Sequence, residues 1–434
     1  MKIYGSGLLL LFFILILSCS DDEITNTQPK EEKEEIPPEI VEKEIVGNIL
    51  TNKTEGIQDH LFLVNDAKND RVYLMNKKAE IEFEWELEHP IGNDCELLDN
   101  GQLLAILQAP EPKIPFGGYG GKIQLINPDF SIDWEYNLSS VNEIAHHDVE
   151  MLPNGNVLMI VWIKKTLEDA ENAGYTGNSA IFPESIYEYN PNSKEVVWRW
   201  NSWDHIIQDQ DPEKENFGNI SESPGKIDIN YNIVENGDIM HANGISYDPY
   251  KDLIYLSVNF YSEVWVIDHS TTTQEASTAT GGNFGKGGDL VYRFGNPEAY
   301  KNTAGSRLFH NNHYPNLIQN GEKTNMLLFM NGNNIQQSSV FEFELPDTFK
   351  LNSNNDNEPK LIWEFTREDL YSEKVSGAEL LSNDNVLISI GSSGAWEVNR
   401  EGEVLWQFEG EGFYWRMYPY HINSQAIQNL NLDL

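Results

Sequence analysis

One pattern recurs six times along this chain and limits the folds open to it. Each copy is a short β-rich run that follows a polar turn and carries an aromatic residue in its middle. The aromatic residues are Trp85, Trp134, Trp198, Tyr292, Trp363 and Trp406. Their mean spacing is about 64 residues, a period typical of stacked supersecondary units. The pattern therefore favours a repeat architecture over a single β-sandwich.

A hairpin and a third strand complete each repeat. Segments such as "CELLDNGQLLAIL" and "VEMLPNGNVLMIV" read as strand, Asn/Gly turn and apolar strand, which is typical of β-hairpins. A third run with an aromatic and an acidic residue follows, as in "SIYEYNP" and "EVWVIDH". Four strands per repeat indicate a propeller blade. The sequence predicts an all-β fold, a six-bladed β-propeller of four-stranded antiparallel blades around a central channel, over residues 44–434.

The N-terminus is typical of an exported protein. Residues 1–18 combine Lys2, an apolar run and small residues, which indicates a signal peptide. The stretch "ILSC" resembles a bacterial lipobox and predicts that Cys19 is lipidated. Residues 19–43 are rich in Glu, Lys and Pro and predict a disordered tether. We expect an exported lipoprotein of the outer membrane, on its periplasmic or cell-surface side, held to the membrane through this lipid only.

Charge and cysteine content narrow the partners further. The formal net charge of −40 disfavours nucleic acid and anionic membrane surfaces as partners, because both would repel the protein. Cys95 is the second of two cysteines, so lipidation of Cys19 would leave it without an intrachain disulfide partner. The sequence gives no indication of the oligomeric state.

Aligning the repeats on their hairpin turns brings polar residues into register. Five successive repeats carry a polar residue at one position, namely Asn93, His147, His241, His313 and Ser376. This position begins the innermost strand, which faces the mouth of the channel. Three imidazoles meeting there are costly to bury unless they are solvated or used. We therefore predict a functional pocket formed by the three histidines.

His146 and His147 are adjacent, and only one of the two side chains is expected to face the channel. Neighbouring residues on a strand point to opposite faces, so both side chains cannot face the channel. We expect His147 in the pocket and His146 packed or hydrogen-bonded between blades. His421 lies after the last predicted blade, so no role is assigned to it.

Two kinds of chemistry suit three converging histidines. Three neutral imidazoles with an open position would hold a catalytic zinc or a non-haem iron. Alternatively, one neutral imidazole is a nucleophile and a second is a proton donor, while an asparagine such as Asn243 stabilises negative charge. A non-catalytic, surface-exposed binding propeller is a further alternative.

A family resemblance favours covalent catalysis. The stretches "HHDVEMLPNGNVLMIVW", "MHANGISYDPYKDLIYLSV", "GKGGDLVYRFGNPEAY" and "RLFHNNHYPNLI" resemble the bacterial arylsulfate sulfotransferases, which do not use the nucleotide sulfate donor PAPS. The likeness covers roughly residues 140–410. It implies a six-bladed propeller that needs no cofactor or metal. A histidine would take a sulfuryl group from an aryl sulfate and pass it to a phenol by ping-pong kinetics.

The resemblance also implies residue roles. His313 matches the sulfated nucleophile, with His310 as a rival, and His147 and His241 match the supporting histidines. Asn243 matches the asparagine of the family's HxN motif, and Ser376 stands where the family has a small hydroxyl residue.

One departure concerns the sulfate-binding cation. The best-studied members carry an arginine on the strand after the HxN motif, where this chain has Asn259. Arg293 or Arg307 could supply the positive charge instead. We expect Asn259, Asn312 and Arg293 to bind substrate. A hydrolase that uses water as acceptor would share the first half of the reaction.

Overall fold

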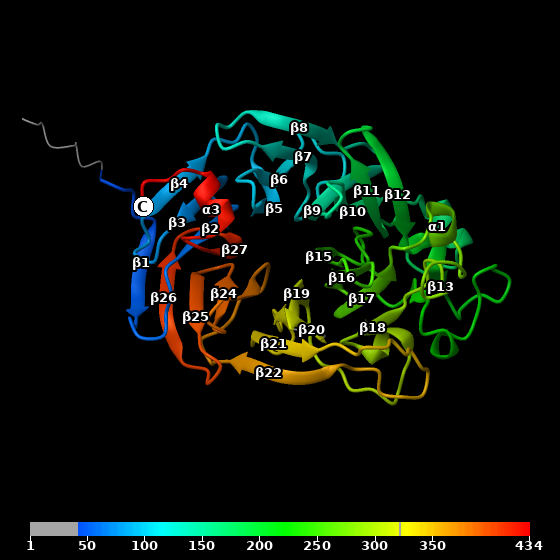
Figure 1. The fold of residues 1–434 in the computed structure, drawn as a ribbon. Coiled ribbons are helices and arrows are strands. Elements are labelled where there is room, and N and C mark those ends of the chain that lie inside the picture. The colour runs from blue at the N-terminus through cyan, green and yellow to red at the C-terminus, as the bar shows by residue number, and fades with distance from the viewer. Residues whose placement is uncertain (1–41, 321–322) are drawn as a thin grey trace, which may run out of the picture. The chain divides into compact units, whose positions relative to one another are not determined.

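A computed structural model describes residues 42–320 and 323–434. Most of its strands are short and are paired as antiparallel hairpins. Within these residues, six antiparallel sheets surround a central axis, and each contributes one innermost strand (Figure 1). The predicted all-β, six-bladed propeller is thereby confirmed. The unit spans Lys43–Leu434.

The second to fifth blades each use four consecutive strands, counted outward from the axis. The second is β5 (Ile91–Leu97), β6 (Leu103–Gln108), β7 (Gly121–Ile126) and β8 (Ile132–Asn137). The third is β9 (Glu143–Met151), β10 (Val157–Ile163), β11 (Glu184–Asn190) and β12 (Glu195–Asn201). The fourth is β15 (Ala242–Asp248), β16 (Leu253–Val258), β17 (Glu263–Asp268) and β18 (Tyr292–Phe294). The fifth is β19 (Asn312–Asn320), β20 (Lys323–Met330), β21 (Ser339–Glu344) and β22 (Lys360–Thr366).

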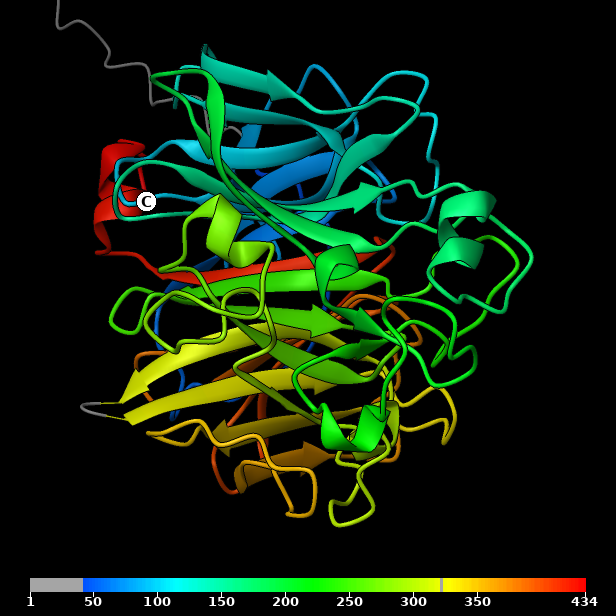
Figure 2. The same cartoon turned by 90° about the vertical axis from the view of Figure 1, so that its right-hand side faces the viewer.

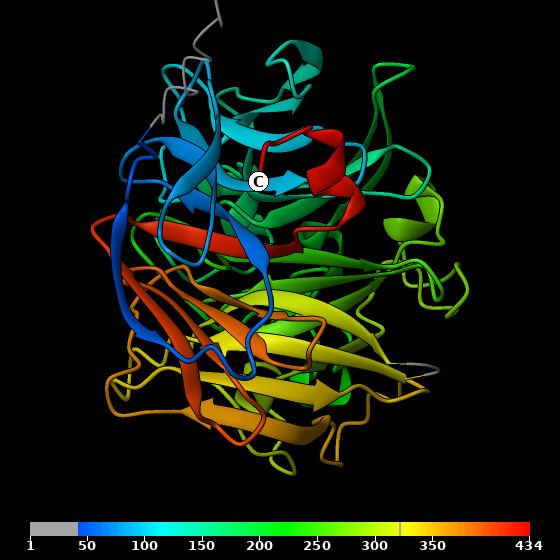
Figure 3. The same ribbon diagram turned by 60° about the vertical axis from the view of Figure 1, so that its left-hand side comes forward.

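The first and sixth blades join the two ends of the propeller. The sixth blade is β23 (Gly377–Leu380), β24 (Val386–Ile390), β25 (Gly394–Val398) and β26 (Val404–Gly410), with β1 (Gly47–Asn52) paired outside β26 (Figure 3). The first blade is β2 (His60–Asp66), β3 (Arg71–Met75) and β4 (Ile81–Trp85), and its innermost strand is β27 (Tyr414–His421). The expectation that His421 follows the last blade is wrong, because this residue ends the inner strand of the first blade.

The six recurring aromatic residues all lie on the fourth strand of a blade, from Trp85 on β4 to Trp406 on β26. Several of them reach the next blade. The indole Nε1 of Trp198 donates to Thr271 Oγ1, that of Trp363 to the Arg400 carbonyl, and that of Trp406 to the Lys77 carbonyl. For these three residues, the position repeated in the sequence is also a contact with the next blade.

Two long segments, residues 201–238 and 269–288, depart from the blade pattern. They contain short elements: η1 (Ser202–His205), β13 (Ile206–Ile207), η2 (Ile220–Glu222), β14 (Ile227–Asp228) and α2 (Thr273–Ala276). Nε2 of the buried His205 contacts the Ala276 carbonyl at 2.8 Å, and Nδ1 contacts Asp289 Oδ1 at 2.7 Å. His205 thus links the two segments through its contacts with Ala276 and Asp289.

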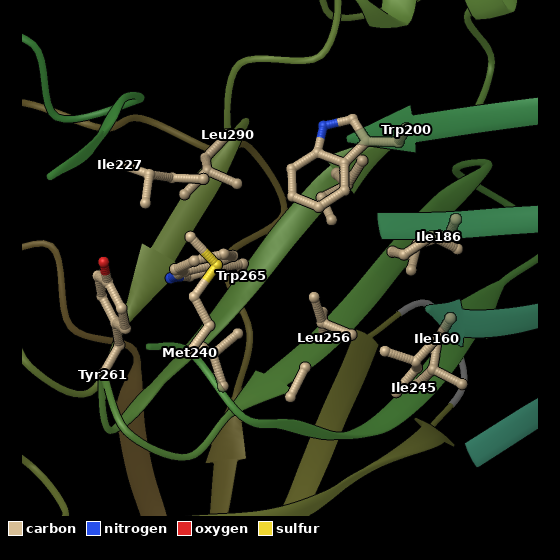
Figure 4. Close-up of a cluster of buried hydrophobic side chains, with 14 of the residues drawn as sticks. Ile160, Ile186, Trp200, Ile227, Met240, Ile245, Leu256, Tyr261, Trp265 and Leu290 are labelled. Atoms are coloured by element: carbon tan, nitrogen blue, oxygen red, sulfur yellow. The ribbon is translucent and has the colours of Figure 1, made fainter. Parts of the chain in front are cut away.

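The largest apolar cluster lies between the third and fourth blades and these segments. Trp200 from β12 and Trp265 from β17 pack with Met240 and with Ile227 of β14 (Figure 4). The Trp200 indole also donates to the Gly288 carbonyl at 2.7 Å. The insertions are therefore fixed to the propeller by its own core.

The remaining helices mark the two faces of the propeller. Helix α1 (Leu167–Asn172) follows β10, and α3 (Gln425–Asn429) follows β27. Because β10 runs antiparallel to the inner strand β9 whereas β27 is itself an inner strand, these helices lie on opposite faces (Figure 2). The inner strands begin on the face that carries α1. A 3₁₀ turn, η3 (Pro297–Tyr300), follows β18.

The predicted signal peptide, lipidated Cys19 and most of the tether lie outside the described residues, and they stay predictions. Cys95 is buried on β5 as a free thiol. In the part of the chain that the structure describes, no helix is long and apolar enough to cross a membrane.

Candidate active site

A cavity of about 460 Å³ lies where the inner strands begin, a volume that suits a small ligand. His147, His241 and His313 all line it. The ring centroids of His147 and His241 are 4.7 Å apart, and Trp415 lies 5.5 Å from His147 and 6.0 Å from His313. Residues 166 positions apart in the sequence thus share one pocket.

Bulges in the inner strands direct these side chains; in β9 the bulge lies mid-strand, whereas in β15 and β19 it lies near the start. The pairing of β9, β15 and β19 with the next strand shifts register beside His147, Asn243 and His313, respectively. His147 and His241 adopt left-handed backbone angles, with φ of 58° and 53°. A bulge re-aims a side chain that regular alternation would send elsewhere.

His313 contacts an asparagine that fixes its tautomer. Its Nδ1 lies 2.5 Å from Asn331 Oδ1, and Asn331 Nδ2 donates to the carbonyls of Ser372 and Val375. Because the amide NH₂ is used by two carbonyls, the amide oxygen faces His313 and accepts from its Nδ1–H. The Nε2 atom of His313 therefore carries the lone pair.

His241 contacts a carboxylate. Its Nδ1 lies 2.5 Å from Oδ2 of Asp238, three residues earlier in the chain, and its ring stacks on Phe260 with centroids 4.7 Å apart. A carboxylate at Nδ1 orients the ring and compensates positive charge on it. Sequence reasoning missed Asp238, although an acidic residue three positions before the histidine was a visible signal.

His147 contacts its neighbour in the chain. The Nδ1 atoms of His146 and His147 are 2.8 Å apart, and Nε2 of His146 lies 2.9 Å from Glu184 Oε2. The His146 ring stacks on Trp162 with centroids 3.6 Å apart. His147 faces the cavity while His146 is packed within the blade. Their side chains nevertheless touch, because the bulge at His147 interrupts the alternation.

The three pocket histidines share one pattern. Each uses Nδ1 for a contact with another side chain, and each Nε2 has no hydrogen-bond partner among the described residues. Burial lowers the pKa of His313 to about 3, and burial followed by the charge of His241 lowers the pKa of His147 well below its ordinary value. His147 and His313 are therefore neutral at neutral pH, and a neutral imidazole is the nucleophilic form.

Of the other predicted site residues, Asn259 lines the cavity. Its amide Nδ2 donates to the Asn312 carbonyl and lies 3.5 Å from His313 Nδ1. Asn243 and Asn312 are fully buried behind the cavity wall, where Asn243 Nδ2 donates to the Asn312 carbonyl at 2.8 Å. Ser376 is also buried and accepts a hydrogen bond from the Gly391 N–H. These three residues hold the backbone that presents the histidines.

The structure places both predicted arginines away from the cavity. Arg293 is fully buried and paired with Glu263, and it also donates to the Lys226 carbonyl. Arg307 donates to Ser262 and to the Phe309 carbonyl. His310 does not line the cavity either, whereas His313 does. The arginines are unavailable because partners from their own surroundings already use them.

Among the cavity-wall residues that sequence reasoning missed, Lys374 and Trp415 matter most for the chemistry. Lys374 is exposed and lines the cavity, and it is the one Lys or Arg among the described lining residues. Trp415 lines it from β27, and its Nε1 is buried without a partner among the described residues. Aligning the repeats on their hairpin turns could not reveal either residue. Lys374 precedes strand β23, and Trp415 lies on β27, which follows the last repeat in the sequence.

A buried arginine lies next to Trp415 in the channel. Arg416 pairs with Asp148 at 2.8 Å and with Asp94 at 3.3 Å, and its guanidinium stacks 3.9 Å from the Tyr314 ring. It also contacts the Asn243 carbonyl at 3.3 Å. These partners come from the inner strands of the second to fifth blades. Arg416 on β27 therefore connects the inner strand of the first blade to those of four other blades.

Metal-binding geometry was one alternative for the histidines. In residues 42–320 and 323–434, no group of three or more His, Cys, Asp or Glu side chains is arranged to hold a metal ion.

The comparison with protein families identifies the chain. The family described as "Arylsulfotransferase (ASST)" matches residues 47–413. The chain belongs to the arylsulfotransferase family. Membership supports aryl sulfotransferase activity in general, with small aryl molecules as substrates. The arylsulfotransferase match covers all of the blade strands except β27, which contributes Trp415 to the cavity.

Comparison with other proteins adds less. A search of curated proteins found no match. Among solved structures, a protein of unknown function from Bacteroides caccae is 14% identical, with a TM-score of 0.47, and covers 83% of this chain and 99% of its own. A putative 6-phosphogluconolactonase from Bacteroides fragilis is 9% identical, with a TM-score of 0.43, and covers 85% and 100%. At these TM-scores neither likeness carries a functional argument.

Proposed function

We propose that this protein moves a sulfuryl group from an aryl sulfate to a phenol through a sulfohistidine intermediate, without a nucleotide donor. In the first half-reaction, Nε2 of His313 attacks the sulfur of the aryl sulfate. An N–S bond forms, the bond from sulfur to the phenolic oxygen breaks, and the electron pair leaves with the phenolate. In the second half-reaction, another phenol attacks the sulfohistidine and restores His313.

The observation that carries this proposal is the hydrogen bond from His313 Nδ1–H to Asn331 Oδ1. It supports a neutral imidazole whose lone pair sits on Nε2, on an atom without a hydrogen-bond partner in the described residues. A neutral imidazole near pH 7 is a competent nucleophile. Asn331 keeps its hydrogen bond after sulfation, because Nε2 and not Nδ1 carries the sulfuryl group.

The two other histidines are suited to the proton that each half-reaction moves. Phenols have a pKa of about 10, so the departing phenolate needs a proton and the accepting phenol must lose one. His147 or His241 supplies the proton in the first half-reaction and removes it in the second. Both expose Nε2 while another side chain holds Nδ1.

Lys374 takes the sulfate-binding role that the sequence assigned to an arginine. Its ammonium group is the one Lys or Arg charge among the described lining residues, beside the carboxylate-bearing Glu373, and Asn259 stands at the sequence position of the family's arginine. The apolar side of the cavity comes from Phe260, Phe413 and Trp415, which suits the aromatic ring of the substrate.

The experiment is a search for the covalent intermediate. Purified protein is exposed briefly to p-nitrophenyl sulfate without acceptor, and its intact mass is measured. We expect one added sulfuryl group per molecule, together with a stoichiometric burst of nitrophenol. Peptide mapping under alkaline conditions should place the group on His313, and phenol added afterwards should remove it.

His313→Gln and His310→Gln form a matched pair of variants. The first should give no burst, and the second should behave like the wild type, because His310 does not line the cavity. A modified His310, or a full burst from His313→Gln, would refute the assignment. Discharge by water as fast as by phenol would indicate a hydrolase.

A further inference from the structure

A chain of three side chains runs from the cavity into the third blade. His147 Nδ1 lies 2.8 Å from His146 Nδ1, and His146 Nε2 lies 2.9 Å from Glu184 Oε2. All three residues are at most 2% exposed, so water does not interrupt the chain. Each contact joins two titratable atoms at hydrogen-bond distance, and the outer end of the chain is the unpartnered Nε2 of His147.

Two protonation patterns satisfy every contact of this chain. In the first, Glu184 is protonated and donates to His146 Nε2, His146 Nδ1–H donates to His147 Nδ1, and His147 carries a proton on Nε2. In the second, the Glu184 proton is on His146 Nε2, the His146 proton is on His147 Nδ1, and the Nε2 proton of His147 has left for the substrate. Glu184 is then a carboxylate. Neither pattern contains a charged histidine.

The surroundings of Glu184 fit both patterns. Its other oxygen, Oε1, accepts from the Trp162 indole at 3.1 Å and from the Ala242 N–H at 2.8 Å. Together with His146, these groups give the carboxylate three donors, so the charge created by proton release would be hydrogen-bonded. Sequence reasoning placed His146 between blades, packed or hydrogen-bonded, and did not single out Glu184.

We propose that Glu184, His146 and His147 form a proton relay that delivers a proton to the departing phenolate and takes one from the accepting phenol. This inference rests on the proposed function and assigns its acid–base step to His147. As the bond from sulfur to oxygen breaks, the Nε2 proton of His147 goes to the phenolate. The proton of His146 moves to His147 Nδ1, and that of Glu184 moves to His146 Nε2.

The charges balance over this step. An aryl sulfate anion and four uncharged groups become a neutral phenol, an overall neutral sulfohistidine and the Glu184 carboxylate. The second half-reaction reverses each transfer. Burial disfavours a charged His147, and outside the relay the charges of His241, His313 and Arg416 also lower its pKa. The relay supplies a proton without passing through a histidinium.

Burial also favours the starting state of the relay. It raises the pKa of Glu184 well above its ordinary value, and the charge of Asp238 adds to this effect. Burial likewise lowers the pKa of His146, with the charge of His241 as the next contribution. Both directions favour the pattern in which the carboxyl group, and not a histidine cation, carries the proton.

The test compares two donors with different leaving groups. Phenyl sulfate releases a basic phenolate that needs a proton, whereas p-nitrophenyl sulfate releases a much weaker base. Glu184→Gln keeps the shape and hydrogen bonds of the side chain but cannot release a proton. Single-turnover sulfation by phenyl sulfate should slow by about 100-fold, within the range of general acid catalysis, while sulfation by p-nitrophenyl sulfate should change little.

A matched control lies on the same strand. Glu188 on β11 also contacts a histidine, His269, at 3.2 Å, and it does not line the cavity. Glu188→Gln should leave both rates unchanged. An equal loss with both donors, or no loss, in Glu184→Gln would overturn the relay and leave the proposed function standing. No sulfohistidine from either donor in the wild type would overturn the proposed function itself.

A second measurement covers the case in which Glu184→Gln does not fold. Long-range ¹H–¹⁵N spectra of histidine-labelled wild-type protein report which ring nitrogen carries the proton. The relay requires His147 protonated on Nε2 and His146 on Nδ1 in the resting protein. A resting His147 protonated on Nδ1 would overturn it.

Discussion

Asn331 Oδ1 accepts the Nδ1 proton of His313 at 2.5 Å, and this one contact decides which nitrogen of the ring can react. The asparagine cannot turn around, because both hydrogens of its amide are held by the carbonyls of Ser372 and Val375. A neutral acceptor at Nδ1 orients the ring without stabilising the protonated, positively charged imidazole. A carboxylate at the same place would stabilise that charged form.

Asn331→Asp should therefore move the pH dependence of the reaction. Burial lowers the pKa of His313 to about 3 in the wild type, and a nearby carboxylate raises a histidine pKa. Activity requires neutral His313, so the acid limb of the kcat/KM profile should shift to higher pH, with the largest losses below neutrality. Asn333→Asp adds the same charge to the cavity wall without contacting Nδ1, and should shift the limb less. Superimposable profiles for Asn331→Asp and wild type would contradict this account.

Gly118 should tolerate no side chain. Its φ is 86°, its carbonyl accepts from the His147 N–H at 2.9 Å, and an added Cβ would overlap the His147 imidazole. Gly118→Ala should lower kcat/KM by about 100-fold through misplacement of His147. Gly117→Ala, at an open position on the same loop, should retain activity. Equal behaviour of the two variants in steady-state assays would show that the close approach has no role.

Lys374 should govern the affinity for the sulfate group. The loss of one charge-assisted hydrogen bond costs about 1.5 kcal/mol, which corresponds to roughly a tenfold rise in KM for the aryl sulfate in Lys374→Ala. Lys374→Arg should restore most of the affinity. Lys350→Ala makes the same change in net charge at an exposed position outside the cavity, and its KM should stay unchanged. The effect of Lys374 should shrink at high salt.

Arg416 should matter for stability more than any surface cation. Arg416→Met leaves the buried carboxylates of Asp94 and Asp148 without their partner, which costs about 3–5 kcal/mol in comparable cases. Adding Asp148→Asn to this variant should recover part of the loss in urea unfolding. The exposed pair of Arg367 with Asp369 offers the comparison, since Arg367→Met should cost at most about 1 kcal/mol. A fully stable Arg416→Met would refute the role of this network.

The propeller and the register of its pocket were readable in the sequence. Six aromatic residues marked the fourth strands, one in each blade, and the hairpin turns gave the position shared by His147, His241 and His313. The aromatic residue and the hairpin turn both recur in successive blades. Such a recurrence can still be recognised when long insertions separate the copies.

The supporting residues of the site were not readable in the same way. Asn331 follows β20 in "FMNG", which looks like an ordinary turn, and its role depends on carbonyls about 40 residues away. Arg293 looked available because its local sequence does not reveal that Glu263 pairs with it. The bulge at His147 also escaped notice, because strict strand alternation allows no contact between His146 and His147.

Strand β27, the inner strand of the first blade, affects the order in which the cavity forms during synthesis. A ribosome makes the chain from the N-terminus, so residues 143–313 emerge with all three histidines well before Trp415 and Arg416 exist. Until β27 has been synthesised, the first blade lacks its inner strand and the cavity lacks the wall that Trp415 provides. The cavity lined by His147, His241 and His313 is therefore complete only once β27 has paired with β2 in the first blade.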